Sequence, residues 1–255
     1  MKIYIHQFLS RTGCFKSKKE IFEAIKNKEI KAEDRLIVSP YYQLYPKCKS
    51  VYWKGKNITV LDKKLYIILN KPKGYLSSKM IPEYARLGKK SLFELIKLDE
   101  RTKRALFCIG RLDEDTSGLI IVTNDGKFCE RITNPDNKIE KKYYVKLLKP
   151  LDKKSKENIE KGIVIELEEN GKARKYKTRE SKIEMKSANE IFMTIYEGKK
   201  REIKRIFESL RNKVTELRRI SIGELKLKEL GLKEGEYLFA EPEYIKEKIY
   251  AKISL

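Results

Sequence analysis

The chain has 255 residues, enough for one or two domains with a sizeable buried core. Its 40% apolar and 38% charged residues exclude a disordered or low-complexity chain. The 59 Lys and Arg residues outnumber the 37 Asp and Glu residues, which gives a net charge of +22. Because so positive a surface attracts phosphates, we expect a nucleic-acid partner; a merely lysine-rich proteome is the alternative explanation.

The scarcity of histidine and cysteine excludes several chemistries. His6 is the one histidine, so catalytic triads, His-rich metal centres and histidine general bases lack their parts. Four scattered cysteines form no C-x-x-C pair, which indicates reduced thiols and argues against zinc and disulfides. No apolar run approaches about 18 residues and the N-terminus lacks a signal-peptide core, so we expect a cytoplasmic protein without membrane contact.

Residues 1–60 form a first predicted domain that is dense in positive charge, with 13 Lys or Arg residues against five Asp or Glu residues. Apolar residues at three- and four-residue steps predict two short amphipathic helices broken at Thr12-Gly13. Ser17 or a neighbour is the expected cap of the second helix. Short strand-like runs follow as far as Trp53, and residues 54–57 are interpreted as a linker.

Residues 61–255 form a larger predicted domain. The apolar run 65–69, stopped by a polar turn at 70–74, predicts a buried strand. Further strands are predicted at 105–110, 118–123, 143–148, 163–167, 190–196 and 214–221, and helices at 91–97, 126–133, 153–161 and 199–211. Strands outnumber helices and do not alternate regularly with them. The predicted fold is therefore α+β, with a mixed, largely antiparallel sheet, flanking helices, and a small helical and β domain at the N-terminus.

Residues 110–126 carry a carboxylate-bearing loop followed by an apolar strand, and read G-R-L-D-E-D-T-S-G-L-I-I-V-T-N-D-G. A loop at the end of a rigid strand can direct its side chains at a substrate. The alternative is a hairpin whose Asp and Ser side chains satisfy their own turn. Spacing alone favours the hairpin.

Several ordered motifs resemble one family. The 110–126 segment is similar to the G-R-L-D-x-x-T-S-G-L signature of RNA pseudouridine synthases, in the branch of the RsuA, RluB, RluE and RluF type that acts on ribosomal RNA. Residues 69–74 resemble the family's N-K-P-x-G run, 140–145 its E-K-x-Y-x-V, 197–207 its E-G-K-x-R-Q-I-R-R-M-F, and 220–223 its I-x-I-G. The resemblance implies a cofactor-independent and metal-independent isomerase that converts uridine to pseudouridine in structured RNA.

The resemblance also implies three catalytic residues. Asp113 is the expected nucleophile, which holds the fragments while the bond from ribose carbon 1 to N1 of the base is broken and remade to carbon 5. Lys204 is the expected cation beside Asp113, since a nearby positive charge favours an ionised carboxylate. Tyr143 is expected to stack on the uracil. Glu114 and Asp115 fall at variable positions of the signature and are interpreted as solvated loop charges.

Seven basic residues are expected to contact RNA. Arg111 resembles the residue that fills the gap left by the flipped base, although a structural arginine that bonds the turn is compatible with this role. The others are expected to meet phosphates, and they are Lys18, Lys19, Lys71, Lys73, Arg201 and Arg205. For Arg205, a solvated basic helix face that grips RNA is nearly as good a description as an active-site role.

The chain departs from the family pattern in places. Residues 1–50 are similar to the RNA-binding module of the ribosomal protein S-four type, with Gly13, Ser17 and Lys18-Lys19 at its G-x-x-S-R-R, but 31–34 read K-A-E-D in place of V-N-G. A helical pair that only packs on the enzyme is the alternative. Lys204 stands where many relatives have Arg, and Glu202 where they have Gln.

Three other functions remain open from the sequence. The same family includes enzymes that act on transfer RNA, and substrate choice depends on variable loops and RNA shape. A non-catalytic RNA-binding or ribosome-assembly protein would keep the basic surface but not need the catalytic set. A glycoside hydrolase using Asp113 and Asp115 is disfavoured by the charge of +22. RNA, in the form of ribosomal RNA or a precursor particle, is the expected partner of a monomeric chain with no implied protein partner.

Overall fold

The computed structural model describes residues 3–45, 48, 50–169 and 171–251. The chain divides into two compact units, residues 1–65 with 78–107 and residues 66–77 with 108–255. The division after residue 60 into an RNA-binding domain and a catalytic domain stays a prediction about function. Within the described ranges, no helix combines the length and the apolar character needed to cross a membrane.

The first unit begins with the helical pair that the sequence predicts. Helices α1 (Ile5–Arg11) and α2 (Lys18–Lys26) flank the break at Thr12-Gly13. The hydroxyl of Ser17 caps α2 by accepting a hydrogen bond from the backbone N–H of Glu20 at 3.1 Å. The helices and the strands of this unit share one buried apolar core, made of Ile5, Leu9, Phe15, Ile21, Ala24, Ile25, Ile30, Ala32, Ile37, Leu44, Val51 and Ile58.

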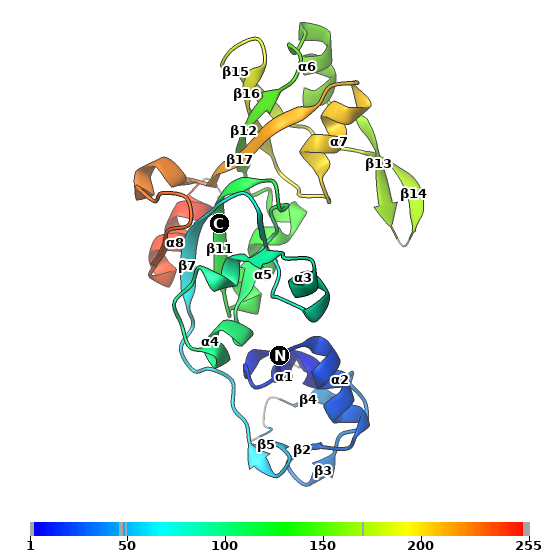
Figure 1. Ribbon diagram of the computed structural model, residues 1–255, viewed down its shortest axis with the longest axis vertical. Coiled ribbons are helices and arrows are strands. Elements are labelled where there is room, and N and C mark those ends of the chain that lie inside the picture. The colour runs from blue at the N-terminus through cyan, green and yellow to red at the C-terminus, as the bar shows by residue number, and fades with distance from the viewer. Residues whose placement is uncertain (1–2, 46–47, 49, 170, 252–255) are drawn as a thin grey trace. The chain divides into compact units, whose positions relative to one another are not determined.

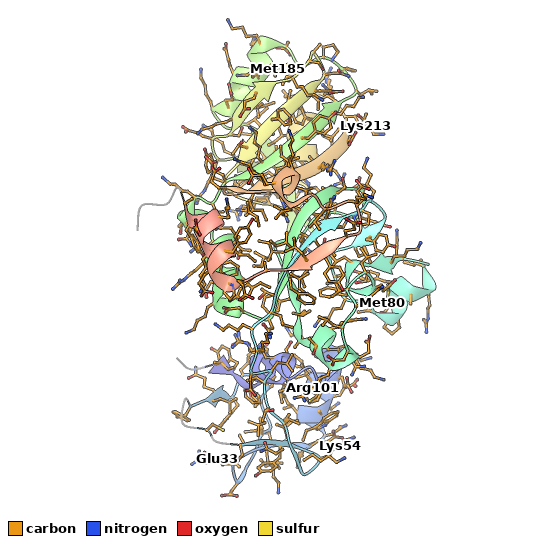
Figure 2. The ribbon with its side chains drawn as sticks, turned by 90° about the vertical axis from the view of Figure 1, so that its left-hand side faces the viewer. Glu33, Lys54, Met80, Arg101, Met185 and Lys213 are labelled. Carbon is orange, nitrogen blue, oxygen red and sulfur yellow. The ribbon has the colours of Figure 1, made fainter. Side chains whose placement is uncertain are left out.

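A small antiparallel sheet in the order β3-β2-β5-β6 and a separate β1–β4 pair complete this unit. The strands are β1 (Ile3–Tyr4), β2 (Ile30–Ala32), β3 (Arg35–Leu36), β4 (Gln43–Leu44), β5 (Val51–Trp53) and β6 (Lys56–Asn57). Residues 54–57 are thus not a linker. Lys54 and Gly55 have φ angles of 49° and 78°, as a two-residue hairpin turn with positive φ at both positions requires. Figure 2 marks Lys54 together with Glu33, which lies between β2 and β3.

Residues 78–107 add short elements to the first unit, namely α3 (Pro82–Arg86), β9 (Lys90–Ser91), the 3-10 helix η1 (Leu92–Glu94) and α4 (Glu100–Ala105). The helix predicted at 91–97 is limited to the single turn η1. Leu92, Phe93 and Ile96 are all buried, so this apolar run fills a core instead of forming one face of a longer helix. Arg101 of α4, labelled in Figure 2, donates from Nε to the carbonyl of Thr12 at 3.1 Å.

The second unit is built on a mixed sheet in the order β15-β16-β12-β17-β11-β7-β19, with β10 beside β11 and β18 beside β17. Along this path all neighbours are antiparallel except β11 and β17, which run parallel. The strands of this unit are β7 (Tyr66–Lys71), β8 (Tyr75–Leu76), β10 (Phe107–Ile109), β11 (Ser117–Thr123), β12 (Lys141–Leu147), β13 (Val164–Glu169), β14 (Lys172–Lys177), β15 (Lys182–Met185), β16 (Glu190–Ile195), β17 (Val214–Ile222), β18 (Leu225–Lys226) and β19 (Tyr237–Phe239). The predicted α+β class and largely antiparallel sheet are confirmed.

Helices cover this sheet. They are α5 (Gly126–Thr133), α6 (Lys153–Glu160), α7 (Glu202–Ser209) and α8 (Pro242–Tyr250), with the 3-10 helices η2 (Pro135–Asn137) and η3 (Leu227–Leu230). Helices α5 and α8 share a buried core with β7 and β11, which includes Ile68, Ile121, Phe128, Ile132 and Ile245. The β13–β14 hairpin lies beside α7, as Figure 1 shows. At the far end of the sheet, Figure 2 labels Met185 and Lys213.

Candidate active site

A buried lysine binds the backbone of the loop that carries Asp113. Lys71, at the end of β7, is fully buried, and its Nζ donates to the backbone carbonyls of Asp113 at 3.1 Å and Thr116 at 2.7 Å. The carbonyls of Pro72 and Glu114 lie at 3.0 and 3.4 Å from the same nitrogen. Burial lowers the pKa of Lys71 to about 8, against the opposing charges of the loop carboxylates. This placement does not agree with the predicted phosphate contact of Lys71, because the ammonium is enclosed by the loop.

Close backbone packing fixes where the loop joins the sheet. Gly118, at the start of β11, pairs with Arg219 of β17. Its φ is +107°, and a Cβ placed there would lie 2.2 Å from the carbonyl oxygen of Arg219. Only glycine fits this position without displacing a strand, so the residue explains part of the T-S-G signature in physical terms.

Helix α7 brings a cation to this loop. The side chain of Lys204 is 7% exposed, and its Nζ lies 3.4 Å from a carboxylate oxygen of Asp113. Ile203, Ile206 and Phe207 are buried, as the apolar stripe of this segment predicts. The stripe anchors α7 and so fixes the backbone from which Lys204 reaches Asp113.

Asp115 is more than a solvated loop charge. Its carboxylate forms an ion pair and hydrogen bond with Lys204. Partial burial raises the pKa of Asp115, but the hydrogen bond and charge of Lys204 outweigh that effect and hold the pKa below its ordinary value. Lys204 therefore serves two carboxylates of one loop. Spacing alone could not show this, because 89 residues separate the partners.

Tyr143 lines the same cavity as Asp113. The cavity has a volume of about 310 Å³ and is bordered by the 110–116 loop, β12, β17 and the segment 197–203. Tyr143 is buried in its wall, whereas Tyr144, the next residue of β12, packs against Phe192 on the opposite face of the sheet. The alternation of the strand thus separates the two tyrosines, and Tyr143 is the one that faces Asp113.

Buried charges form another part of the cavity lining. Lys141 and Arg219 contribute two cations, and Glu197 and Glu202 two carboxylates. Burial and the charge of Arg219 lower the pKa of Lys141 to about 8, although the carboxylates act in the opposite direction. Burial, followed by the neighbouring carboxylate of Glu197, raises the pKa of Glu202.

These groups are held by specific partners. Arg219 donates from Nε to the carbonyl of Leu119 at 2.7 Å. Glu197 accepts hydrogen bonds from the phenol of Tyr176 and from the backbone N–H of Arg179. Sequence reasoning missed Lys141, Glu197 and Arg219 as cavity residues. The first two lie inside motifs that carry the family resemblance, which was the available signal.

The remaining predicted RNA contacts lie in different surroundings. Arg111 and Arg201 are exposed and line the cavity, and Lys73 is exposed near the Lys71 turn. Arg205 is half-buried, and its guanidinium donates to the carbonyl of Glu166 at 2.6 Å, which ties the β13–β14 hairpin to α7. In the first unit, Lys18 and Lys19 are exposed at the start of α2.

Comparisons with known proteins show the family of the chain. Residues 65–209 match the RNA pseudouridylate synthase family, a region that covers more than half of the chain. The chain therefore belongs to this family. It is 32% identical to ribosomal small subunit pseudouridine synthase A of Vibrio cholerae, over 90% of this chain and 92% of the relative. It is 31% identical to the protein of the same name from Escherichia coli K12, over 84% and 86%.

A solved structure extends the likeness to the whole fold. A crystal structure of a pseudouridylate synthase, 28% identical in sequence, superposes with a TM-score of 0.66 over 97% of this chain and 99% of the other. The resemblance that the sequence motifs indicate is thus confirmed, and the chain is identified as a pseudouridine synthase.

Proposed function

We propose that this chain isomerises uridine to pseudouridine in the RNA of the small ribosomal subunit, with Asp113 as the nucleophile. The relatives named above act on the small subunit by name, and they match this chain over nearly its whole length. The observation that carries the assignment of Asp113 is its position in the cavity, 3.4 Å from the buried ammonium of Lys204 and beside Tyr143.

The reaction rearranges bonds without loss of atoms. The carboxylate of Asp113 attacks, the bond between ribose carbon 1 and N1 breaks, and the freed uracil turns so that carbon 5 faces the sugar. A new bond forms between ribose carbon 1 and carbon 5, and the bond to Asp113 breaks. The proton on carbon 5 leaves and N1 takes up a proton, so the product has the same atoms as the substrate and the carboxylate is regenerated. The Nζ of Lys204 lies 3.4 Å from a carboxylate oxygen of Asp113, so it holds the attacking group in position in the cavity wall.

Residues of the cavity wall are placed to bind the flipped base. Tyr143 offers an aromatic face on which an extruded uracil stacks. Arg111, exposed at the cavity mouth, fills the space that the flipped nucleotide leaves in the RNA. Lys73 and Arg201 hold phosphates around the opening, while Lys18 and Lys19 add affinity from the first unit. We further propose that the chain acts as a monomer in the cytoplasm, where its substrate is made.

Tritium release from RNA labelled at uridine carbon 5 tests the proposal. Transcripts of small-subunit RNA, large-subunit RNA and transfer RNA are compared with wild type, Asp113→Asn and the control Asp62→Asn, whose side chain is exposed in the first unit. We expect release from small-subunit RNA by wild type and control, and none by Asp113→Asn although it binds the RNA.

Other outcomes would overturn parts of the proposal. Release from transfer RNA alone would contradict the substrate, and release by Asp113→Asn at the wild-type rate would contradict the nucleophile. If naked RNA gives no release, precursor small-subunit particles are the next substrate, and failure there too would indicate a binding protein.

A further inference from the structure

The first unit carries an aromatic cluster formed by Tyr4, His6, Phe22 and Tyr41. The rings of Tyr4 and His6 are nearly parallel, at 13° and 5.8 Å between centroids. Tyr41 stands edge-on to both, at 89° to Tyr4 and 77° to His6. Phe22 of α2 lies 6.1 Å from His6. The cluster therefore has two parallel rings with a third ring standing across them.

Main-chain contacts hold this arrangement in place. Tyr4 of β1 pairs with Gln43 of β4, and the N–H of Ile5 donates to the carbonyl of Tyr42 at 2.8 Å. The Nδ1 of His6 donates to the carbonyl of Pro40 at 2.7 Å. The residues before and after Tyr41, Pro40 and Tyr42, thus accept hydrogen bonds from residues of α1. The rings are therefore preorganised and need little ordering to bind a ligand.

The cluster does not serve the core of the unit. Tyr41 is 64% exposed and Tyr4 is 38% exposed, and none of the four rings belongs to the buried apolar core. Aromatic rings contribute most to stability when they are buried. Two exposed tyrosine rings supported by the half-buried rings of His6 and Phe22 are instead typical of a surface that stacks on a ligand.

Positive charge adjoins the rings. The Nζ of Lys18 lies 5.4 Å from the centre of the Phe22 ring. Lys19 and Lys26 stand three residues before and four residues after Phe22, so the helix places both next to it. All three lysines are exposed. Two acidic residues of α2 lie among them: Glu23, 3.9 Å from Lys19, and Glu20, whose carboxylate accepts a hydrogen bond from the backbone N–H of Lys16. Aromatic faces beside exposed lysines fit the bases and phosphates of an RNA strand.

We propose that the aromatic cluster stacks on unpaired bases of the RNA substrate, while the lysines of α2 hold the adjoining phosphates. The first unit then recognises single-stranded RNA, in addition to contributing charge. This inference rests on the proposed function in one respect, namely that RNA is the substrate. It goes further because phosphate contacts alone do not distinguish an unpaired strand from a duplex.

Fluorescence anisotropy with the full chain tests the inference. The probes are a labelled single-stranded RNA dodecamer and a fully paired RNA hairpin with the same number of phosphates. Tyr4→Ala/Tyr41→Ala is compared with Tyr4→Phe/Tyr41→Phe, which keeps the rings, and with Tyr244→Ala, a residue of α8 that is 37% exposed. We expect the Ala pair to weaken binding of the single strand by at least about tenfold, with little change for the hairpin.

The salt dependence separates stacking from charge. The Ala pair should leave the slope of log affinity against log salt unchanged, since no phosphate contact is lost. The Phe pair and Tyr244→Ala should bind both probes as wild type does. Equal losses on both probes, or a flatter slope, would overturn the inference, and unchanged binding by the Ala pair would point to a protein partner for the cluster.

If the Ala pair fails to fold, the Phe pair still tests the inference. It retains both rings, so a loss of affinity for the single strand in the Phe pair would contradict stacking. Tritium release distinguishes the two proposals. At saturating RNA the Ala pair should release tritium at the wild-type rate. A wild-type chain that stacks on RNA but never releases tritium would refute the proposed function alone.

Discussion

The lysines of the two units differ in what surrounds them. In the second unit, Lys71, Lys141 and Lys204 are buried, and each donates to a carbonyl or carboxylate of the same unit. In the first unit, Lys18 and Lys19 project from α2 into solvent. The positively charged residues behind the net charge of +22 are therefore of two kinds, namely buried lysines with partners in the protein and exposed lysines. The buried lysines contact the loop that carries Asp113 or the cavity lining, and under the proposed function the exposed ones attract the RNA.

Substitution of Lys204 should give the largest effect among the buried lysines. Replacing it by Gln removes the charge beside Asp113 and Asp115, so we expect the single-turnover rate to fall by about 10²- to 10³-fold. Lys204→Arg keeps the charge and should stay within about tenfold of wild type. The exposed Lys153→Gln on α6 is the control. A Gln variant with the wild-type rate would show that the ion pair has no part in catalysis.

Lys71 tests whether a buried lysine builds the loop. Lys71→Met leaves several loop carbonyls without their donor, so the free energy of unfolding should fall by about 3 kcal/mol and tritium release should fall with it. Lys73→Met, two residues away and exposed, should change stability by less than about 0.5 kcal/mol. Urea unfolding measures both. Equal stabilities would mean that the loop holds its shape without Lys71.

Glu202 gives a pH-dependent test of the buried charges. Because its pKa is raised in the folded chain, the folded state keeps a proton that the unfolded state loses as pH rises above the ordinary value of 4.5. Stability from this group is full below that pH and is lost as pH rises through the folded pKa. Gln does not titrate, so Glu202→Gln should not lose stability as pH rises. Its free energy of unfolding at pH 8 should exceed that of wild type by on the order of 2 kcal/mol.

The same measurement at pH 5 should show a much smaller gain for Glu202→Gln, because wild-type Glu202 is then largely protonated in the folded state. Glu83→Gln, at an exposed position of α3, is the control and should show no gain at either pH. A gain that is independent of pH would mean that packing, and not the carboxylate pair, explains the effect.

The exposed lysines should give the smallest effect. Lys18→Gln/Lys19→Gln should weaken RNA binding by about tenfold and reduce the slope of log affinity against log salt by about 1.5, since two phosphate contacts are lost. Lys246→Gln, an exposed position on α8, should leave both values unchanged. Anisotropy titrations at several salt concentrations measure the slope. An unchanged slope would show that α2 does not meet phosphate.

The elements with a regular apolar pattern were predictable from sequence. Strand β11 and helix α5 fall within one residue of their predicted ranges, because their apolar residues repeat at one period and glycine or a capping residue bounds them. Strand β14 was missed since K-A-R-K-Y-K has no apolar alternation and pairs only with β13. Helix α8 was missed because only Ile245 and Ile249 mark its buried face.

Only the site residues that lie in family motifs could be assigned a role from the sequence. Asp113, Tyr143 and Lys204 are assigned by resemblance; the structure places Asp113 and Tyr143 in the lining of one cavity and Lys204 in contact with Asp113. The sequence predicts a phosphate contact for Lys71, whereas the structure buries it. Its actual partners lie more than 40 residues further along the chain, at Asp113 and Thr116. Local patterns cannot show contacts between residues so far apart in sequence.

The contrast between buried and exposed charge leads to one decisive measurement. Dissociation constants and single-turnover rates at saturating small-subunit RNA are determined for Asp113→Asn and for Lys18→Gln/Lys19→Gln. We predict that Asp113→Asn binds RNA as wild type does but does not react, and that the lysine pair binds more weakly but reacts at the wild-type rate. A reactive Asp113→Asn, or a lysine pair that is slow at saturation, would contradict the account.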